Sequence, residues 1–280
     1  MEMLSGKEIA SEIKTKVREE NVQSNIVPHL AIIVVGDAKE NLLYIGLKQK
    51  AIEEVGGKTT ILSLPASMKK TDLLMKIEDL NQDNDIHGIL IQLPLPERLA
   101  PDQDEFLSAI HPKKDVDGFN PVNRGKLMGG SPDFISCAAL ACMEVVRRYF
   151  KQLEGKSVLL VGDSFDVIQP LALMFLEEKA RVTVIPQYDP DLLKLADIAV
   201  IEKGDPLIVK EHDIKPGALL IDAGFYWYHD HLCGNIDREV LANVKGSLLP
   251  VPGGMGPILI AELMANLQRA AEGMERGNNG

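Results

Sequence analysis

Short apolar runs alternate with longer amphipathic stretches along almost the whole chain, and this alternation limits the folds open to it. A continuous run of about 4–8 apolar residues is typical of a buried strand, whereas an apolar residue at every third or fourth position indicates a helix. Strands that alternate with helices form right-handed crossovers and a mostly parallel sheet. We therefore predict an α/β fold. In the first half the predicted strands are His29 to Val35, Thr59 to Leu64 and Gly88 to Leu93, and the predicted helices are Ser5 to Glu20, Asn41 to Val55, Thr71 to Asn81 and Asp102 to Ile110.

The second half repeats the alternation and resembles a nucleotide-binding α/β domain. A chain of 280 residues is long for one core, so we expect two domains. The loop that follows Val161 stands where such domains bind phosphate groups. The predicted strands of this half are Ser157 to Val161, Arg181 to Ile185, Ala196 to Ile201 and Ala218 to Ala223, and its helices are Ala138 to Phe150, one ending at Glu178, and Ile258 to about Arg269.

Composition and charge exclude several classes of protein. The net charge of −11 argues against a nucleic-acid partner, because phosphates require a basic face. No apolar run reaches the about 20 residues needed to span a bilayer, and the N-terminus has no signal-peptide pattern. The cysteines Cys137, Cys142 and Cys233 lack the spacing of a zinc site or a disulfide framework. We expect a cytoplasmic protein that contacts neither membrane nor nucleic acid.

Candidate functional residues follow the predicted strands, where parallel sheets bind their ligands. Tyr44 and Lys48 are spaced to share one helix face, Gln92 follows the third strand, and Asp117 lies in a turn between the two halves. Each has a plain alternative: a surface lysine, a core-edge tyrosine, a strand cap or a solvated turn. Taken singly, those plain readings are favoured.

Taken together, the motifs resemble one family. The chain contains, in this order, Val35-Gly36-Asp37, Tyr44-x-x-x-Lys48, Gln92-Leu93-Pro94-Leu95-Pro96, Lys114-Asp115-Val116-Asp117-Gly118-Phe119 and Pro250-Val251-Pro252-Gly253-Gly254-Met255-Gly256-Pro257. This set resembles the bifunctional methylenetetrahydrofolate dehydrogenase/methenyltetrahydrofolate cyclohydrolase family, and the resemblance extends from about Leu4 to about Ala271. The Gln-Leu-Pro-Leu-Pro and Pro-Val-Pro-Gly-Gly segments are its most specific parts.

The resemblance implies a binding site for tetrahydrofolate one-carbon derivatives. Lys48 matches the central catalytic lysine of that family, Gln92 the glutamine that orients it, and Asp117 the aspartate that binds the pterin ring. Tyr44 matches a tyrosine that stacks on the aminobenzoyl group. The residue types suit the chemistry, because water attack on a methenyl carbon needs a base that is neutral when required, and burial disfavours the charged form of a lysine. A carboxylate suits the paired N–H donors of a pterin.

The resemblance also implies a folate cleft between two domains, residues 1–118 with 258–280 and residues 119–257, the second being Rossmann-like. The loop of Pro252, Gly253 and Gly254 is expected to contact substrate, because such a loop brings backbone N–H groups close to a ligand. The tail from Glu272 to Gly280 is expected to be disordered. By the same analogy the protein is a homodimer.

The dinucleotide loop departs from the family pattern of Gly-Arg-Ser-x-x-Val-Gly-x-Pro. Asp163 replaces the phosphate-pairing arginine, and Ile168 replaces a glycine that lets the dinucleotide approach the backbone. The segment Pro186-Gln187-Tyr188-Asp189 lacks the usual basic cluster, and Phe225-Tyr226 adds bulk at the nicotinamide end. The family's cofactor-loop residues that are retained are Gly162, Ser164, Val167 and Pro170.

From these departures we expect NADP or NAD binding to be weakened or lost, with NAD ranked above NADP. The predicted activity is hydrolysis of 5,10-methenyltetrahydrofolate to 10-formyltetrahydrofolate, with NADP-dependent dehydrogenase activity in doubt. Two alternatives stay open: a fully bifunctional enzyme that uses NAD or NADP, and a catalytically idle homologue that serves as a binding or regulatory subunit. No metal is expected, since His229-Asp230-His231 falls in a predicted hairpin turn.

Overall fold

The computed structural model describes residues 1–36, 39–239, 241 and 244–278. By internal contacts it divides into two compact units, one of Met1–Ser11 with Cys137–Leu259 and one of Glu12–Ser136 with Ile260–Gly280. Both are α/β, as the alternation of patterns predicts. The predicted division into a folate domain, residues 1–118 with 258–280, and a Rossmann-like domain, residues 119–257, remains a prediction. Within the described residues, no helix is long and apolar enough to cross a membrane.

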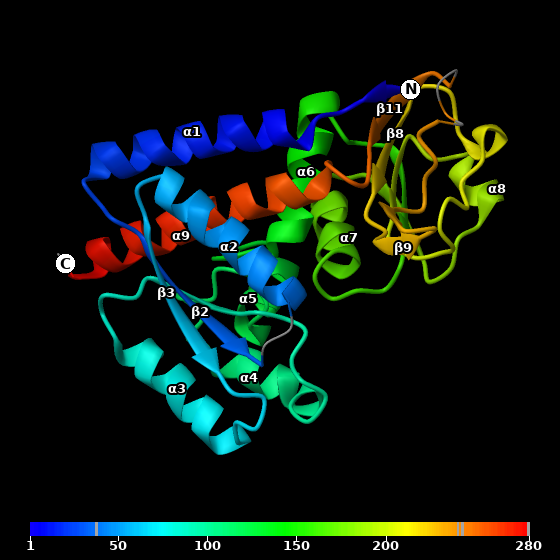
Figure 1. The fold of residues 1–280 in the computed structure, drawn as a ribbon. Helices are drawn as coiled ribbons and strands as arrows, with labels where there is room; N and C mark the ends of the chain where they lie inside the picture. Colours follow the sequence, from blue (N-terminus) through cyan, green and yellow to red (C-terminus); the bar gives the residue numbers. More distant parts are fainter. Residues whose placement is uncertain (37–38, 240, 242–243, 279–280) are drawn as a thin grey trace. The chain divides into compact units, whose positions relative to one another are not determined.

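The unit that contains Glu12–Ser136 is built on a parallel three-stranded sheet in the order β3-β2-β4. Strand β2 is buried on both faces except at its first residue, as expected for the centre of a parallel sheet. The connection from β2 to β3 and that from β3 to β4 run in opposite directions, so their helices α2 and α3 cover opposite faces (Figure 1). The elements are β2 (His29–Val35), α2 (Lys39–Glu54), β3 (Lys58–Leu64), α3 (Lys70–Gln82), β4 (Gly88–Ile91), the 3-10 turn η1 (Ala100–Asp102), α4 (Gln103–Ala109) and α5 (Pro121–Met128).

The second unit is built on a six-stranded parallel sheet in the order β1-β11-β8-β7-β5-β6. All residues of β7 and β8 are buried, and they form the centre of this unit's core with α6 packed against β8. An antiparallel hairpin of β9 and β10 follows β8. The elements are β1 (Glu2–Met3), α6 (Cys137–Tyr149), β5 (Ser157–Val161), α7 (Ile168–Glu177), β6 (Arg181–Ile185), α8 (Pro190–Leu193), β7 (Ile198–Ile201), η2 (Glu211–Asp213), β8 (Ala218–Asp222), β9 (Tyr226–Tyr228), β10 (His231–Cys233) and β11 (Gly246–Leu249).

Two long helices, α1 (Gly6–Ser24) and α9 (Met255–Asn278), each contain a boundary between the units. The capping residue predicted for α1 is confirmed, because the Glu8 amide donates to Ser5 Oγ at 3.3 Å. The disordered tail predicted from Glu272 onward is wrong as far as Asn278, since α9 continues to that residue. Ion pairs one turn apart, such as Arg276 to Glu272 at 3.1 Å, support these last turns.

Candidate functional site

Lys48 and Gln92 meet at the carboxyl edge of the three-stranded sheet. Lys48 lies on α2 and Gln92 directly follows β4, and Lys48 Nζ donates to Gln92 Oε1 at 3.0 Å. Lys48 is half-buried rather than buried. Tyr44, one helical turn earlier, is 40% exposed, so its ring has a free face. Asp37 lies outside the described residues. The structure therefore brings together Lys48 and Gln92, which the motifs single out.

The amide of Gln92 is held in one orientation. Its Nε2 donates to the Leu93 carbonyl at 2.8 Å, and its backbone N–H donates to the Ile33 carbonyl at 2.9 Å. Gln92 is 9% exposed, and the peptide bond between Leu93 and Pro94 is cis. With Nε2 engaged, only Oε1 is directed at Lys48. Gln92 can thus orient the amine without adding a charge.

The turn that carries Asp117 is organised by Asp115. Asp115 is 1% exposed. Its carboxylate accepts hydrogen bonds from the backbone N–H groups of Phe119 at 3.0 Å and Asn120 at 2.8 Å, and from the side-chain amide of Asn123 at 2.7 Å. Burial raises the pKa of Asp115, and these donors oppose the rise. Asp117 itself is half-buried. The predicted turn at this junction is confirmed, and the hydrogen bonds to the buried Asp115 carboxylate stabilise it.

Two further residues fix the same turn. Asn266 on α9 is fully buried, and its Nδ2 donates to the carbonyls of Val116 at 2.8 Å and Ile135 at 3.1 Å. Gly118 has φ +71°, and a Cβ built there would lie 2.5 Å from the Ile135 carbonyl carbon. Sequence reasoning missed Asn266, although an amide among the apolar residues of the last helix was a usable signal.

Lys114, in the same motif, has a structural role. Its Nζ donates to the carbonyls of Leu80 at 2.9 Å and Asp83 at 2.6 Å, at the end of α3. The residue is 4% exposed, and burial lowers the pKa of its ammonium. A cation at a helix C-terminus meets carbonyls that have no partner within the helix.

The glycine–proline loop packs against the start of α1. The Gly6 amide donates to the Gly253 carbonyl at 3.2 Å, and a Cβ on Gly6 would lie 1.8 Å from the Gly254 carbonyl oxygen. The bond between Val251 and Pro252 is cis. Sequence reasoning missed Gly6, whose need for glycine arises only from this tertiary contact. The substrate contacts of Pro252, Gly253 and Gly254 remain a prediction.

In the second unit, the loop after β5 has the strand–glycine–helix form predicted for a phosphate site. Gly162 has φ +142°, and a Cβ there would meet Glu202 Oε2 at 2.4 Å, so the position requires glycine. Ser164 Oγ accepts the amides of Val167 and Ile168, each at 3.2 Å, at the start of α7. Pro170 is buried in that helix. These four retained residues share one loop and helix, and their contact with a cofactor remains a prediction.

Ile168 does not project from this loop. It is 1% exposed, and its Cγ1 lies 3.0 Å from the position of a Cβ on Gly162. Because the side chain is buried against Gly162, the structure gives no support to the expected obstruction of the dinucleotide by Ile168.

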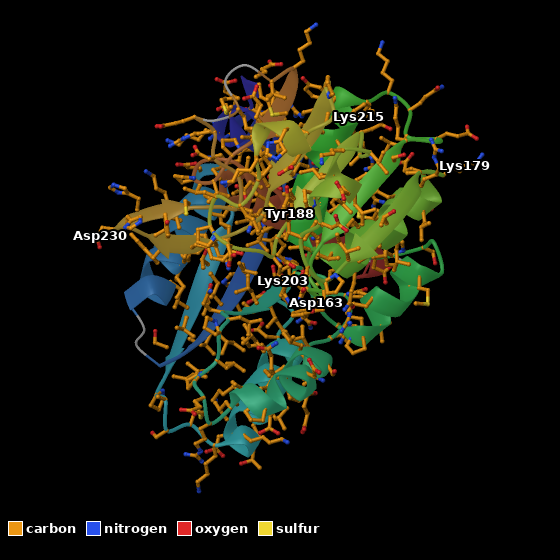
Figure 2. All side chains as sticks on the ribbon, turned by 90° about the vertical axis from the view of Figure 1, so that its right-hand side faces the viewer. Asp163, Lys179, Tyr188, Lys203, Lys215 and Asp230 are labelled. Atoms are coloured by element: carbon orange, nitrogen blue, oxygen red, sulfur yellow. The ribbon has the colours of Figure 1, made fainter. Side chains whose placement is uncertain are left out.

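The charge of Asp163 is also balanced in the structure. Asp163 Oδ1 accepts a hydrogen bond from Lys203 Nζ, and the two labels lie side by side in Figure 2. Two more carboxylates, Asp166 and Glu202, lie nearby, and burial raises the pKa of both. Glu202 is hydrogen-bonded by Ser164, which opposes the rise in its pKa. The expected anion is thus present, but it is paired.

Of the two bulky residues expected near the nicotinamide, Phe225 and Tyr226, only Phe225 is largely exposed. Phe225 is 56% exposed, whereas the Tyr226 hydroxyl donates to the Glu202 carbonyl at 3.3 Å. Asp222, fully buried at the end of β8, accepts the amides of Gly224, Asn235 and Ile236 at 2.9–3.1 Å and anchors this segment.

The predicted hairpin between Tyr228 and Cys233 is confirmed. Its turn consists of His229 and Asp230, with φ +46° and +61°, between β9 and β10. Among the described residues, no group of three or more His, Cys, Asp or Glu side chains is placed to hold a metal ion.

Comparisons with known proteins cover both units. Residues 4–117 match the family model "Tetrahydrofolate dehydrogenase/cyclohydrolase, catalytic domain", and residues 136–275 match the corresponding "NAD(P)-binding domain". The chain is 53% identical to "Bifunctional protein FolD 1" of Syntrophomonas wolfei over 97% of this chain and 99% of that one. It is 40% identical to "Bifunctional protein FolD" of Listeria innocua over 97% of both chains.

Solved structures agree with these matches. The bifunctional enzyme FolD of Campylobacter jejuni superposes with a TM-score of 0.91 at 34% identity, over 97% of this chain and 98% of that one. A Trypanosoma brucei FolD, crystallised with NADP cofactor and inhibitor, gives a TM-score of 0.90 at 30% identity over 99% and 98%. An NAD(P)-binding domain is therefore present, and the comparisons give no support to the expected divergence of its site or loss of dinucleotide binding. The chain belongs to the tetrahydrofolate dehydrogenase/cyclohydrolase family.

Proposed function

We propose that this protein interconverts tetrahydrofolate one-carbon derivatives, as a 5,10-methenyltetrahydrofolate cyclohydrolase that also oxidises 5,10-methylenetetrahydrofolate with a nicotinamide dinucleotide. The observation that carries the proposal is the contact between Lys48 Nζ and Gln92 Oε1 at 3.0 Å. An amine held by a neutral amide at a strand end has the position and chemistry of a general base. The 53% identity with a relative named bifunctional supports both activities.

In the hydrolysis, the Lys48 amine accepts a proton from the water that attacks the methenyl carbon, and a new C–O bond forms. The bond from that carbon to one ring nitrogen then breaks, this nitrogen takes the proton from Lys48, and the hydroxyl of the adduct releases its own proton to solvent as the formyl C=O forms. Gln92 keeps the amine oriented through its Oε1. Asp117 accepts the paired N–H groups of the pterin, and Tyr44 stacks on the aminobenzoyl ring. Asp115 keeps Asp117 in place through the turn it braces.

What supports a dinucleotide site in the second unit is the strand–glycine–helix order after β5, in which Gly162 has a φ of +142° and α7 begins at Ile168. A dinucleotide held at this loop would supply the acceptor for the hydride that leaves the methylene carbon. We propose a preference for NAD over NADP, with the dehydrogenase the weaker of the two activities. The preference for NAD is supported by the segment after β6, which has no cation to pair with the 2′-phosphate of NADP: Pro186, Gln187 and Tyr188 are uncharged. Asp189, which follows them, is a carboxylate that caps α8.

The test compares Lys48→Met with Lys50→Met, a matched control because Lys50 is exposed on the same helix. We expect methenyl hydrolysis, followed by loss of the substrate's absorbance, to disappear in Lys48→Met and to persist in Lys50→Met, with unchanged circular dichroism in both. Unchanged turnover in Lys48→Met would remove this lysine from the mechanism. Methenyl formation with NAD and with NADP tests the preference.

Two general properties belong to the same proposal. We propose a cytoplasmic homodimer, by analogy with the family. Sedimentation equilibrium of the purified chain at micromolar concentration tests the oligomeric state, and a mass of one chain would refute the dimer.

A further inference from the structure

Lys203 lies where the strand order of the six-stranded sheet reverses, between the neighbouring strands β5 and β7. Strand β5 is followed by α7 and β6 on one side, while β7 pairs with the other side of β5. In parallel sheets of this kind, ligands bind outside the carboxyl ends of the two strands that flank such a point. Asp163 follows β5 and Lys203 follows β7, so their ion pair spans this position.

The ammonium of Lys203 is accessible and stays charged. The Lys203 side chain is 49% exposed and that of Asp163 is 62% exposed. The hydrogen bond that Lys203 Nζ donates to the Asp163 carboxylate raises the pKa of Lys203. Gly204, with φ +143°, lies in the bend that follows β7. Figure 2 shows Lys203 beside Asp163, with Lys179 and Lys215 far from them in the view.

We propose that Lys203 supplies the positive charge that binds the diphosphate of the nicotinamide dinucleotide. In this chain the cation comes from the loop after β7, and its partner, the anion Asp163, lies in the loop after β5. Lys203 pairs with the Asp163 carboxylate, and its charge also acts on the nearby carboxylate of Glu202. The inference rests on the proposed dehydrogenase activity.

Replacing the two partners of the Lys203–Asp163 ion pair in turn is expected to change NAD affinity in opposite directions. Lys203→Ala removes the cation, and we expect NAD affinity to fall about tenfold at low ionic strength, as for one charged contact. Asp163→Asn removes the competing anion, and we expect NAD affinity to rise several-fold. A purely structural ion pair would make both variants bind more weakly, so the opposite signs are the decisive readout.

The matched control is Lys215→Ala. Lys215 Nζ also forms an ion pair, with Asp197 Oδ1 at 2.7 Å, but Asp197 precedes β7 and so lies at the opposite edge of the same sheet. We expect its NAD affinity to be unchanged. Binding of NAD and of NADP to all four proteins is measured by calorimetry at low and high salt, and methenyl hydrolysis is measured without dinucleotide on the same samples.

The outcomes separate this inference from the proposed function. A loss in Lys203→Ala that shrinks at high salt, with a gain in Asp163→Asn and unchanged hydrolysis, supports it. Equal NAD affinity in Lys203→Ala and wild type overturns the role of Lys203 and leaves the dehydrogenase intact. If wild type hydrolyses the methenyl substrate but binds neither dinucleotide, the inference and the dehydrogenase half of the proposal both fail.

Discussion

Replacement of Asp115 by asparagine tests whether this carboxylate braces the turn that carries Asp117. One oxygen of Asp115 accepts the Phe119 amide at 3.0 Å, and the other accepts the Asn120 amide at 2.8 Å and Asn123 Nδ2 at 2.7 Å. An asparagine has one acceptor oxygen. Whichever way its amide is turned, at least one N–H donor then faces an NH2 group.

The magnitude follows from this count. One lost hydrogen bond to a charged acceptor costs about 1.5–3 kcal/mol, and a donor left without an acceptor adds about 1–3 kcal/mol. Part of this is offset, because burial raises the pKa of Asp115 and so already disfavours its charged form. We expect the free energy of unfolding to fall by about 2–4 kcal/mol.

The assay is urea unfolding followed by far-ultraviolet circular dichroism, together with calorimetric titration of a folate analogue. Asp104→Asn is the matched control, since Asp104 is exposed on α4 and its substitution is expected to change stability by less than about 0.5 kcal/mol. If Asp115→Asn unfolds at the same urea concentration as the control and binds the folate analogue equally well, the brace assigned to Asp115 does not exist.

The remaining predictions concern three other positions. Asp117→Asn keeps the size of the side chain but loses its charge, so we expect folate-analogue affinity measured by calorimetry to fall by about 1.5–3 kcal/mol; unchanged affinity would leave Asp117 only a turn residue. Gly118→Ala forces a Cβ to 2.5 Å from the Ile135 carbonyl carbon at φ +71°, and we expect urea unfolding to show a loss of about 2–4 kcal/mol, whereas full stability would contradict the close contact. Burial raises the pKa of Asp222 from 3.8 to about 6, so the folded state holds a proton that the unfolded state has lost in this range. The free energy of unfolding should therefore fall by roughly 3 kcal/mol as pH rises from about 4 to 6, and an unaltered slope in Asp222→Asn would count against this assignment.

The strands were the most predictable part of the fold. Three strands have the bounds that the sequence predicts, because a continuous apolar run between turn residues fixes where a buried strand begins and ends. They are β2 (His29–Val35), β5 (Ser157–Val161) and β6 (Arg181–Ile185). Helix ends shifted by one to four residues, since the last turns depend on neighbours. α9 extends beyond its predicted end at Arg269 for a different reason: its final turns are polar, and local ion pairs such as Arg276 to Glu272 support them.

The site was predictable where a motif fixes it and not where the tertiary structure does. Lys48 and Gln92 are far apart in sequence, and only the family motifs joined them. The pairing of Asp163 with Lys203 could not be read from the sequence, because it depends on which strand lies next to β5. The same holds for Ile168, because its burial depends on a tertiary contact with Gly162.

The β9–β10 hairpin gives this protein an optical probe confined to one unit. The chain has one tryptophan, Trp227, which is 72% exposed in β9. Emission excited in the indole band therefore reports on the unit that contains Cys137–Leu259, whereas circular dichroism averages over the helices of both. Denaturation curves recorded both ways on one sample will coincide if the units melt cooperatively and separate if they melt in turn.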